Sequence, residues 1–128
     1  MTPLQKRKQQ YKRGDVVYAC LNKASDTSSQ QSGVRPCIVV SNDNCNKFSP
    51  VITIVPLTSQ SKTSLPTHMI LYADNVKIPD GFNLKTSLVL CEQITLIDKA
   101  QIVREEVAHV NSTAMRLVDR KIKIQLGV

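Results

Sequence analysis

Short runs of apolar and β-branched residues, separated by polar turn-forming segments, recur along this sequence. The run over residues 15–21 is apolar at both alternating sets of positions, which indicates a strand that is covered on each face. Runs with the composition of further strands cover residues 37–41, 51–57, 68–72 and 87–91, and a shorter candidate covers 106–110. The segments 22–33 and 42–50 are rich in turn residues and are expected to be loops.

The periodicity becomes helical at the C-terminal end of the chain. Asn111 or Ser112 can cap a helix that runs to residue 126, and Gly127 ends it. The apolar positions expected on its buried face are Ala114, Leu117, Val118, Ile122 and Leu126. The whole pattern predicts a mainly β fold with helices, namely a small, strongly curved antiparallel barrel with a C-terminal helix.

Length and composition suit one domain, since the 128 residues are 41% hydrophobic. Residues 1–12 are basic and contain no acidic residue, so we expect an N-terminal arm, either a solvated tail or a phosphate contact, ahead of a domain over 13–128. No apolar stretch is long enough for a membrane span or a signal peptide, which predicts a cytoplasmic protein. The net charge of +7 favours a polyanionic partner.

Neither the cysteines nor the histidines form a pattern that predicts chemistry. The four cysteines lack a CxxC pair, so neither a zinc site nor a disulfide framework is expected. Cys20, Cys37 and Cys91 lie in apolar runs and are expected to be buried as small hydrophobic residues. His68 and His109 also lie in apolar runs, where a structural role is more common than a catalytic one. With three Tyr, two Phe and no Trp, the chain offers little surface for base stacking.

A series of short motifs follows in order along the chain. They are RGDV at 13–16, GVRP at 33–36, IVVSND at 38–43, NKFSP at 46–50, VPLTSQ at 55–60, LPTH at 65–68, CEQI at 91–94 and IDK at 97–99. In order and spacing this series closely resembles the MazF/PemK family of toxin endoribonucleases. The resemblance covers residues 13–126.

The resemblance implies a compact SH3-like antiparallel β-barrel that forms a homodimer, with single-stranded RNA in a groove across the dimer interface. It implies sequence-specific cleavage that leaves a 2′,3′-cyclic phosphate and a 5′-hydroxyl. No metal ion or other cofactor is expected, because a guanidinium can bind the phosphate and the sequence shows no carboxylate cluster or His/Cys ligand set. It also implies a cognate antitoxin whose tail occupies the same groove. No membrane partner is expected.

Two residues match the family positions that carry the catalysis. Arg35 matches the Arg of the G-x-R-P motif, and Pro36 after it is expected to hold Arg35 in an extended conformation at a loop-to-strand junction. A planar guanidinium can bind two phosphoryl oxygens at once, although an isolated Arg is more often part of a surface ion pair. Thr58 matches the Thr of the T-x-Q segment and can donate a hydrogen bond to a phosphoryl oxygen, although a Thr at a strand end often bonds its own backbone.

The expected substrate-binding residues are amides. Gln93 can read a base edge with a donor and an acceptor together, and Gln60 and Asn42 match family positions in the same groove. Gln30 replaces a Glu that many family members have in the first loop, and it is expected to bind substrate there. The replacement leaves the general base open between Arg35 itself, a bound water and Glu92.

Two other functions are compatible with the same pattern. One is a non-catalytic RNA-binding barrel, in which Arg35 holds phosphate without turnover. The other is a gyrase-poisoning toxin of related fold, in which the barrel binds a topoisomerase. The GVRP segment at 33–36 together with Thr58 favours the ribonuclease.

Overall fold

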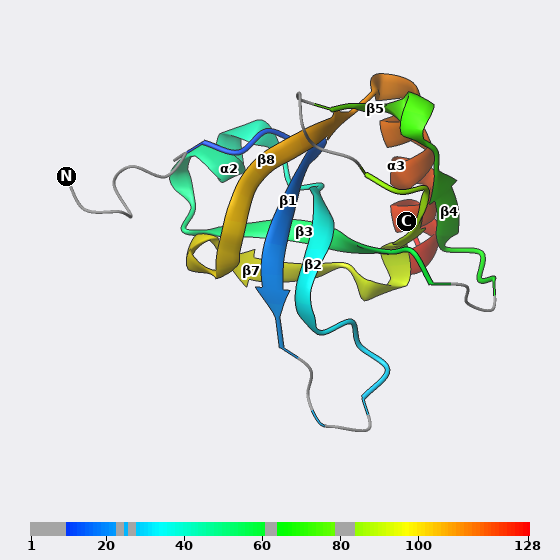
Figure 1. The fold of residues 1–128 in the computed structure, drawn as a ribbon, viewed down its shortest axis with the longest axis horizontal. Helices are drawn as coiled ribbons and strands as arrows, with labels where there is room; N and C mark the ends of the chain where they lie inside the picture. The colour runs from blue at the N-terminus through cyan, green and yellow to red at the C-terminus, as the bar shows by residue number, and fades with distance from the viewer. Residues whose placement is uncertain (1–9, 23–24, 26–27, 61–63, 79–83) are drawn as a thin grey trace.

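Figure 1 shows the computed structural model of the chain, which describes residues 10–22, 25, 28–60, 64–78 and 84–128. Its strands are all paired in antiparallel fashion. The strands are β1 (Asp15–Leu21), β2 (Gly33–Val39), β3 (Val51–Thr58), β4 (His68–Leu71), β5 (Val76–Lys77), β6 (Ser87–Leu90), β7 (Thr95–Asp98) and β8 (Ile102–Val110). The helices and 3₁₀ turns are α2 (Asp43–Phe48), η1 (Ala73–Asn75), η2 (Cys91–Gln93), η3 (Lys99–Gln101) and α3 (Ser112–Leu126).

The strands form one strongly curled sheet in the order β4-β6-β3-β2-β1-β8-β5, and β7 pairs with the first half of β3. Two apolar clusters lie on the two faces of this sheet. One contains Val16 of β1 and Val118 of α3, and the other contains Val17 of β1 and Ile97 of β7. Because side chains alternate between the faces of a strand, β1 supplies both clusters, which confirms its expected burial on both faces.

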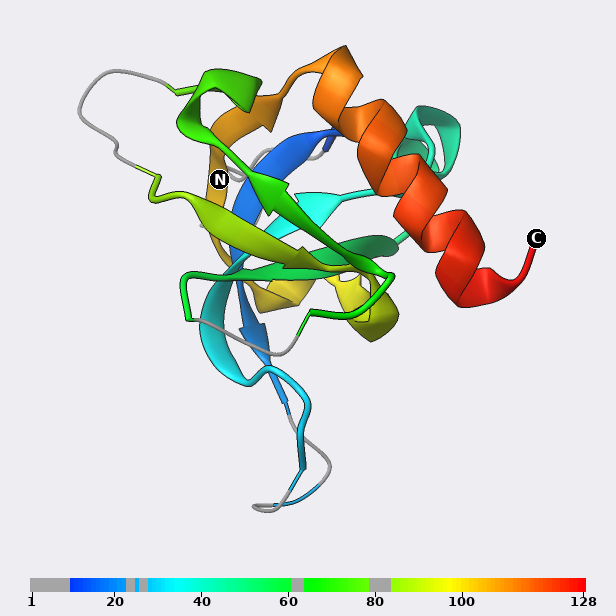
Figure 2. The same ribbon diagram turned by 90° about the vertical axis from the view of Figure 1, so that its right-hand side faces the viewer.

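Helix α3 covers one side of the curled sheet, next to β4, as Figure 2 shows. Asn111 caps it by accepting a hydrogen bond from the backbone of Ala114, as predicted. Its buried face is narrower than expected, because Leu117 and Leu126 are exposed while Met115 is buried. None of the helices in the described residues has the length and apolar character to cross a membrane.

Several features of the fold differ from those predicted from the sequence. The segment 42–50 is not all loop, since it contains α2, whose N-terminus is capped by Asn42. The short strand expected at 106–110 is the end of the nine-residue strand β8, whose first half is largely exposed and therefore lacks an apolar signal. Cys20 is exposed rather than buried, because it lies at the outer end of β1.

The basic N-terminal segment joins the fold before residue 12. Tyr11 is buried against the cluster that contains Ile97. Arg13 forms an ion pair with Asp119 of α3 and donates from Nε to the backbone carbonyl of Val40 at 2.9 Å. The remainder of the predicted arm, residues 1–9, lies outside the described residues.

Candidate active site

The pairing of the central strands brings Arg35 and Thr58 together. Arg35 lies inside β2, where it pairs with Ala19 of β1, and not at the loop-to-strand junction expected from the sequence. Strands β2 and β3 are antiparallel, and Cys37 pairs with Pro56. If this register is continued by two residues, Arg35 lies across from Thr58. The two side chains line one pocket of about 200 Å³, which we call the Arg35 pocket. Its other lining residues are Tyr18, Pro36, Leu57, Ser59, Leu84, Lys85 and Ser87.

Among the residues that the structure describes, the guanidinium of Arg35 is held through its Nε nitrogen. Nε donates to the backbone carbonyl of Ser32 at 3.0 Å, and the side chain is half-buried. Within the described residues its terminal nitrogens have no hydrogen-bond partner and form no ion pair. The surface ion pair considered for this residue is therefore not formed with any described acid, and the planar donor fork is available to an anion.

Thr58 is almost fully buried, with 3% of its surface exposed. Its hydroxyl oxygen accepts a hydrogen bond from the backbone N–H of Gln60 at 3.2 Å, which is the local contact common for a Thr at a strand end. A hydroxyl that accepts one bond still carries a proton to donate. Thr58 can therefore fill the structural role and the phosphate-binding role at the same time.

A second pocket, of about 390 Å³, lies between the β1–β2 loop and η2, and we call it the Gln93 pocket. It contains Gln30 and Gln93, two of the expected substrate-binding residues. The side-chain oxygen of Gln93 accepts a hydrogen bond from the backbone N–H of Gln31 at 2.7 Å. Its Nε2 has no hydrogen-bond partner among the described residues, so one polar end of the amide is available to a ligand.

Gln60 lies in a third hollow, of about 510 Å³, next to the Arg35 pocket. The two hollows share the lining residues Thr58, Ser59 and Ser87. Gln60 is exposed, so its amide is accessible beside the pair of Arg35 and Thr58.

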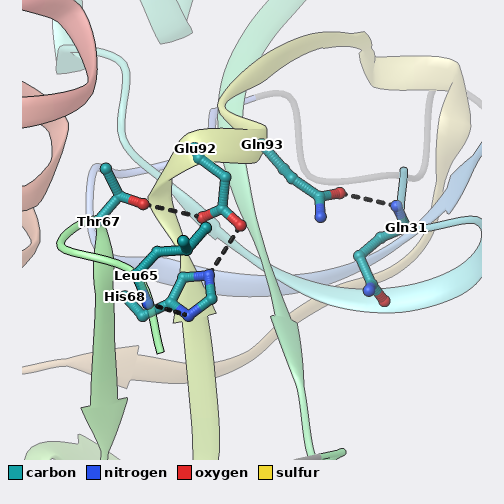
Figure 3. A network of polar contacts seen from close by, with 6 residues as sticks. All are labelled: Gln31, Leu65, Thr67, His68, Glu92 and Gln93. Carbon is teal, nitrogen blue, oxygen red and sulfur yellow. Dashed lines mark hydrogen bonds and ion pairs between the residues drawn. The ribbon is translucent and has the colours of Figure 1, made fainter. Parts of the chain in front are cut away.

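A polar network that sequence reasoning missed joins β4 to η2, as Figure 3 shows. His68 Nε2 lies 2.8 Å from one carboxylate oxygen of Glu92, and the hydroxyl of Thr67 donates to the other at 3.2 Å. The role expected for His68 was structural, and this pairing agrees with it. The partner Glu92 is 24 residues away, so no local pattern could have identified it.

Comparison with known proteins assigns the chain to a family. The sequence profile described as "PemK-like, MazF-like toxin of type II toxin-antitoxin system" matches residues 12–126. The chain belongs to this family. It is 37% identical over 118 residues to "Endoribonuclease EndoA" of Bacillus subtilis, covering 91% of this chain and 95% of that protein. It is 32% identical to "Endoribonuclease MazF" of Staphylococcus saprophyticus, covering 91% and 92% of the two chains.

Solved structures of MazF proteins share the fold of the chain. MazF from Deinococcus radiodurans superposes with a TM-score of 0.71 at 21% identity, covering 94% of this chain and all of that one. An endoribonuclease from a Mycobacterial species, solved in complex with its cognate antitoxin, gives a TM-score of 0.68 at 21% identity, with 92% and 96% covered. These likenesses confirm the curled antiparallel sheet with a C-terminal helix that the sequence predicts.

Membership of the PemK/MazF family, with relatives that are endoribonucleases, makes the chain a toxin-family enzyme that cleaves RNA. This favours the first of the three functions considered from the sequence. Asn42, which the family resemblance assigned to the groove, lines neither the Arg35 pocket nor the Gln93 pocket, and its substrate contact stays a prediction. Asn42 caps α2 by accepting from the backbone of Cys45 at 2.8 Å, and it lies in a hollow beside Arg13 and Asp119 rather than in the pockets above.

The described residues also include titratable groups that lie outside these pockets. Asp15, Glu106 and His109 bring potential metal-ligand atoms within 4.8 Å of one another, but Asp15 already pairs with His109 Nδ1 at 2.9 Å. Burial raises the pKa of the Cys37 thiol to about 12, so this thiol stays protonated at neutral pH. Burial, reinforced by the nearby carboxylate of Glu92, raises the pKa of Cys91 to about 12 as well.

Proposed function

We propose that this PemK/MazF-family endoribonuclease cuts single-stranded RNA, at a preferred sequence, in the Arg35 pocket, with Arg35 and Thr58 as the catalytic residues. The observation that carries the proposal is the meeting of these two side chains in one pocket, with the terminal nitrogens of Arg35 unpaired among the described residues. A guanidinium beside a hydroxyl donor offers several hydrogen bonds to the oxygens of one phosphodiester.

The reaction uses a nucleophile that the RNA itself provides. The 2′-hydroxyl oxygen forms a bond to the adjacent phosphorus and loses its proton, and the bond from phosphorus to the 5′-oxygen breaks as that oxygen takes up a proton. The products are a 2′,3′-cyclic phosphate and a 5′-hydroxyl. Arg35 stabilises the negative charge that builds up on the phosphoryl oxygens, and Thr58 donates to one of them.

No metal ion is needed in this scheme. The described residues that line the Arg35 pocket include one arginine and one lysine but no carboxylate, histidine or cysteine. Such a lining binds anions and has none of the usual ligands of a divalent cation.

Glu92 fits a role as general base poorly. Both of its carboxylate oxygens already accept hydrogen bonds, from Thr67 and His68, and its side chain lines the Gln93 pocket rather than the Arg35 pocket. Tyr18 and Lys85 are the titratable side chains that line the pocket with Arg35. We therefore assign removal of the 2′-hydroxyl proton of the RNA to a group within the Arg35 pocket and not to the carboxylate of Glu92.

The flanking hollows supply the contacts to the bases. The free Nε2 of Gln93 can donate to an acceptor on a base edge, and the exposed amides of Gln30 and Gln60 can reach unpaired bases on either side of the scissile phosphate. A chain of net charge +7 also attracts the RNA backbone.

The proposal includes two protein partners and a location. Toxin structures of this fold have been solved in complex with a cognate antitoxin, which supports an antitoxin for this chain. Exposed apolar side chains support a homodimer, because they offer surface for a partner to cover. They include Val34, Leu65, Ile70 and Leu96 on the strands and loops and Leu117 and Ile124 on α3. The cytoplasm, where RNA and antitoxin are both made, is the proposed location.

The test is cleavage of a long single-stranded RNA in excess EDTA, followed by analysis of the new ends. The expected fragments carry a 5′-hydroxyl, which polynucleotide kinase labels without prior phosphatase treatment, and a cyclic phosphate at the 3′ side. Loss of cleavage in EDTA with recovery in magnesium, or fragments that carry a 5′-phosphate, would overturn the proposed chemistry.

A further inference from the structure

The side chain of His68 has a defined orientation and protonation pattern. The backbone N–H of Leu65 donates to Nδ1 at 3.3 Å, so Nδ1 is an acceptor and the ring proton is on Nε2. That Nε2–H then donates to Glu92 at 2.8 Å. The ring is buried, with 3% of its side chain exposed, so His68 and Glu92 form a fixed pair at the start of β4.

Glu92 fastens the η2 turn to β4. Its other carboxylate oxygen accepts from the Thr67 hydroxyl at 3.2 Å, and the backbone N–H of the adjacent Cys91 donates to the Thr67 carbonyl at 3.3 Å. Gln93 is the next residue on the same short turn. The three contacts therefore hold the backbone from which the Gln93 side chain projects.

Gln93 in turn holds the β1–β2 loop close to the point where β2 begins. Its side-chain oxygen accepts from the backbone N–H of Gln31 at 2.7 Å. The next residue, Ser32, accepts from Arg35 Nε at 3.0 Å through its carbonyl oxygen. A continuous series of contacts thus leads from His68 through Glu92 and Gln93 to the guanidinium of Arg35.

We propose that Glu92 is a positioning residue for Arg35, acting through Gln93 and the loop backbone at Gln31 and Ser32. The proposal rests on the catalytic role proposed above for Arg35. A guanidinium is planar, so fixing Nε–H on one carbonyl fixes the plane in which both terminal nitrogens lie. A loop that joins two strands has many conformations of similar energy, and the bond from Gln31 to Gln93 selects one of them.

A pair of substitutions at Glu92 separates this role from acid–base chemistry. In Glu92→Gln the amide oxygen can accept from His68 and the amide nitrogen can donate to the Thr67 hydroxyl, so the network survives without a carboxylate. In Glu92→Ala both contacts are lost. Positioning therefore predicts near-parent behaviour for Glu92→Gln and impairment for Glu92→Ala, whereas a general base would be lost in both.

The direct readout is the Nε–Hε signal of Arg35 in ¹⁵N NMR spectra of the RNA-free protein. In Glu92→Ala we expect its exchange with water to become about fivefold faster, because the bond to Ser32 opens more often. Glu92→Gln should restore the parent exchange rate. Gln93→Met should accelerate exchange in the same way, and the double variant Glu92→Ala/Gln93→Met should add little, because both changes break one series of contacts.

Cleavage kinetics provide the second readout. Glu92→Ala should lower kcat about tenfold with less than about a threefold change in KM, since a displaced guanidinium mainly weakens transition-state binding. A matched control is His109→Ala, which removes the other described histidine–carboxylate pair. That pair joins His109 to Asp15 at the end of β1 farther from Ala19, the residue that pairs with Arg35. This control should leave both the Arg35 signal and kcat unchanged.

The outcomes distinguish the two proposals. If Glu92→Ala is folded by circular dichroism and the Arg35 signal exchanges at the parent rate, the positioning role is wrong, whatever the kinetics show. Loss of activity in Glu92→Gln equal to that in Glu92→Ala would also overturn it, in favour of a carboxylate that acts chemically. If the Arg35 signal changes as expected while kcat does not, Glu92 does position Arg35 and the catalytic role of Arg35 is what fails.

Discussion

The Arg35 pocket and the Gln93 pocket both include residues of β3, Leu57 and Thr58 in the first and Pro56 in the second, but they are built differently. Most of the wall of the Arg35 pocket comes from strands, with Tyr18 on β1, Arg35 on β2 and Thr58 on β3. The wall of the Gln93 pocket comes mainly from the β1–β2 loop, η2 and the neighbouring exposed strand β7. Ladder hydrogen bonds fix the first pocket, whereas side-chain hydrogen bonds such as Gln31 to Gln93 hold the second.

Because the two pockets are built differently, the Arg35 pocket suits the phosphate chemistry and the Gln93 pocket suits the reading of bases. Phosphate chemistry requires donors placed within a fraction of an ångström, which paired strands provide. Reading of bases tolerates adjustment and benefits from it, and loops provide that. We therefore expect substitutions of the phosphate-contacting side chains Arg35 and Thr58 to change kcat, and substitutions of base-contacting side chains such as Gln30 to change binding and sequence preference.

The largest effect is expected for Arg35→Lys. The substitution keeps the charge but replaces a planar fork with a single-point donor, so transition-state stabilisation should fall by about 3 kcal/mol, or about a hundredfold in kcat. Affinity for an uncleavable substrate should change much less. Single-turnover cleavage and binding titrations measure the two quantities, and cleavage at close to the parent rate would remove Arg35 from the reaction.

A smaller effect is expected for Thr58→Val, about tenfold in kcat, because one neutral donor is lost at nearly constant volume. The backbone N–H of Gln60 also loses its acceptor, so the free energy of unfolding should fall by about 1 kcal/mol. Thr58→Ser is the matched control, since it keeps the hydroxyl and should retain most of the activity. Equal rates for the Val and Ser variants would show that the hydroxyl is not used.

A test of the other pocket is Gln30→Ala, for which we expect KM to rise about threefold and kcat to stay at the parent value. Gln30 is exposed on the loop and lines the Gln93 pocket, so it can contact RNA only outside the reacting phosphate. Initial rates on two RNAs that differ beside the cut site would also show an altered preference. A drop in kcat as large as that of Thr58→Val would erase the distinction between the pockets.

Sequence reasoning worked best where burial leaves a regular pattern. Strand β1 was predicted with its observed bounds because both faces are covered. Strand β7 was missed because Ile97 is its one buried residue, which gives no alternation. Helix α2 was missed because six residues are too few to show a helical period.

For the site, the sequence identified residue types better than positions. Arg35 and Thr58 could be named from their motifs, but that they share a pocket follows from the β2–β3 register, which no local pattern encodes. The bond between Gln31 and Gln93 spans 62 residues, and its backbone donor leaves no trace in the side-chain sequence. The resemblance predicts Asn42 in the groove, and its additional local role as a helix cap could have been predicted from Asn followed by Asp.

Thiol labelling perturbs the protein least, because it needs no substitution. The labelling rate of a buried cysteine measures how often the region around it opens. Cys37 lies two residues after Arg35 on β2 and is fully buried, whereas Cys20, at the end of β1 beside the loop, is exposed. With its pKa raised to about 12, Cys37 has almost no thiolate between pH 7 and 9, so Ellman's reagent should modify it only when the strand opens. The thiol of Cys20 should react in the folded protein, because it is exposed to the reagent. Mass spectrometry of labelled peptides distinguishes the two, and denaturant should expose both. If Cys37 were labelled in the folded protein as fast as the exposed Cys20, the strand that carries Arg35 would open readily, and the rigid strand-built catalytic pocket would be contradicted.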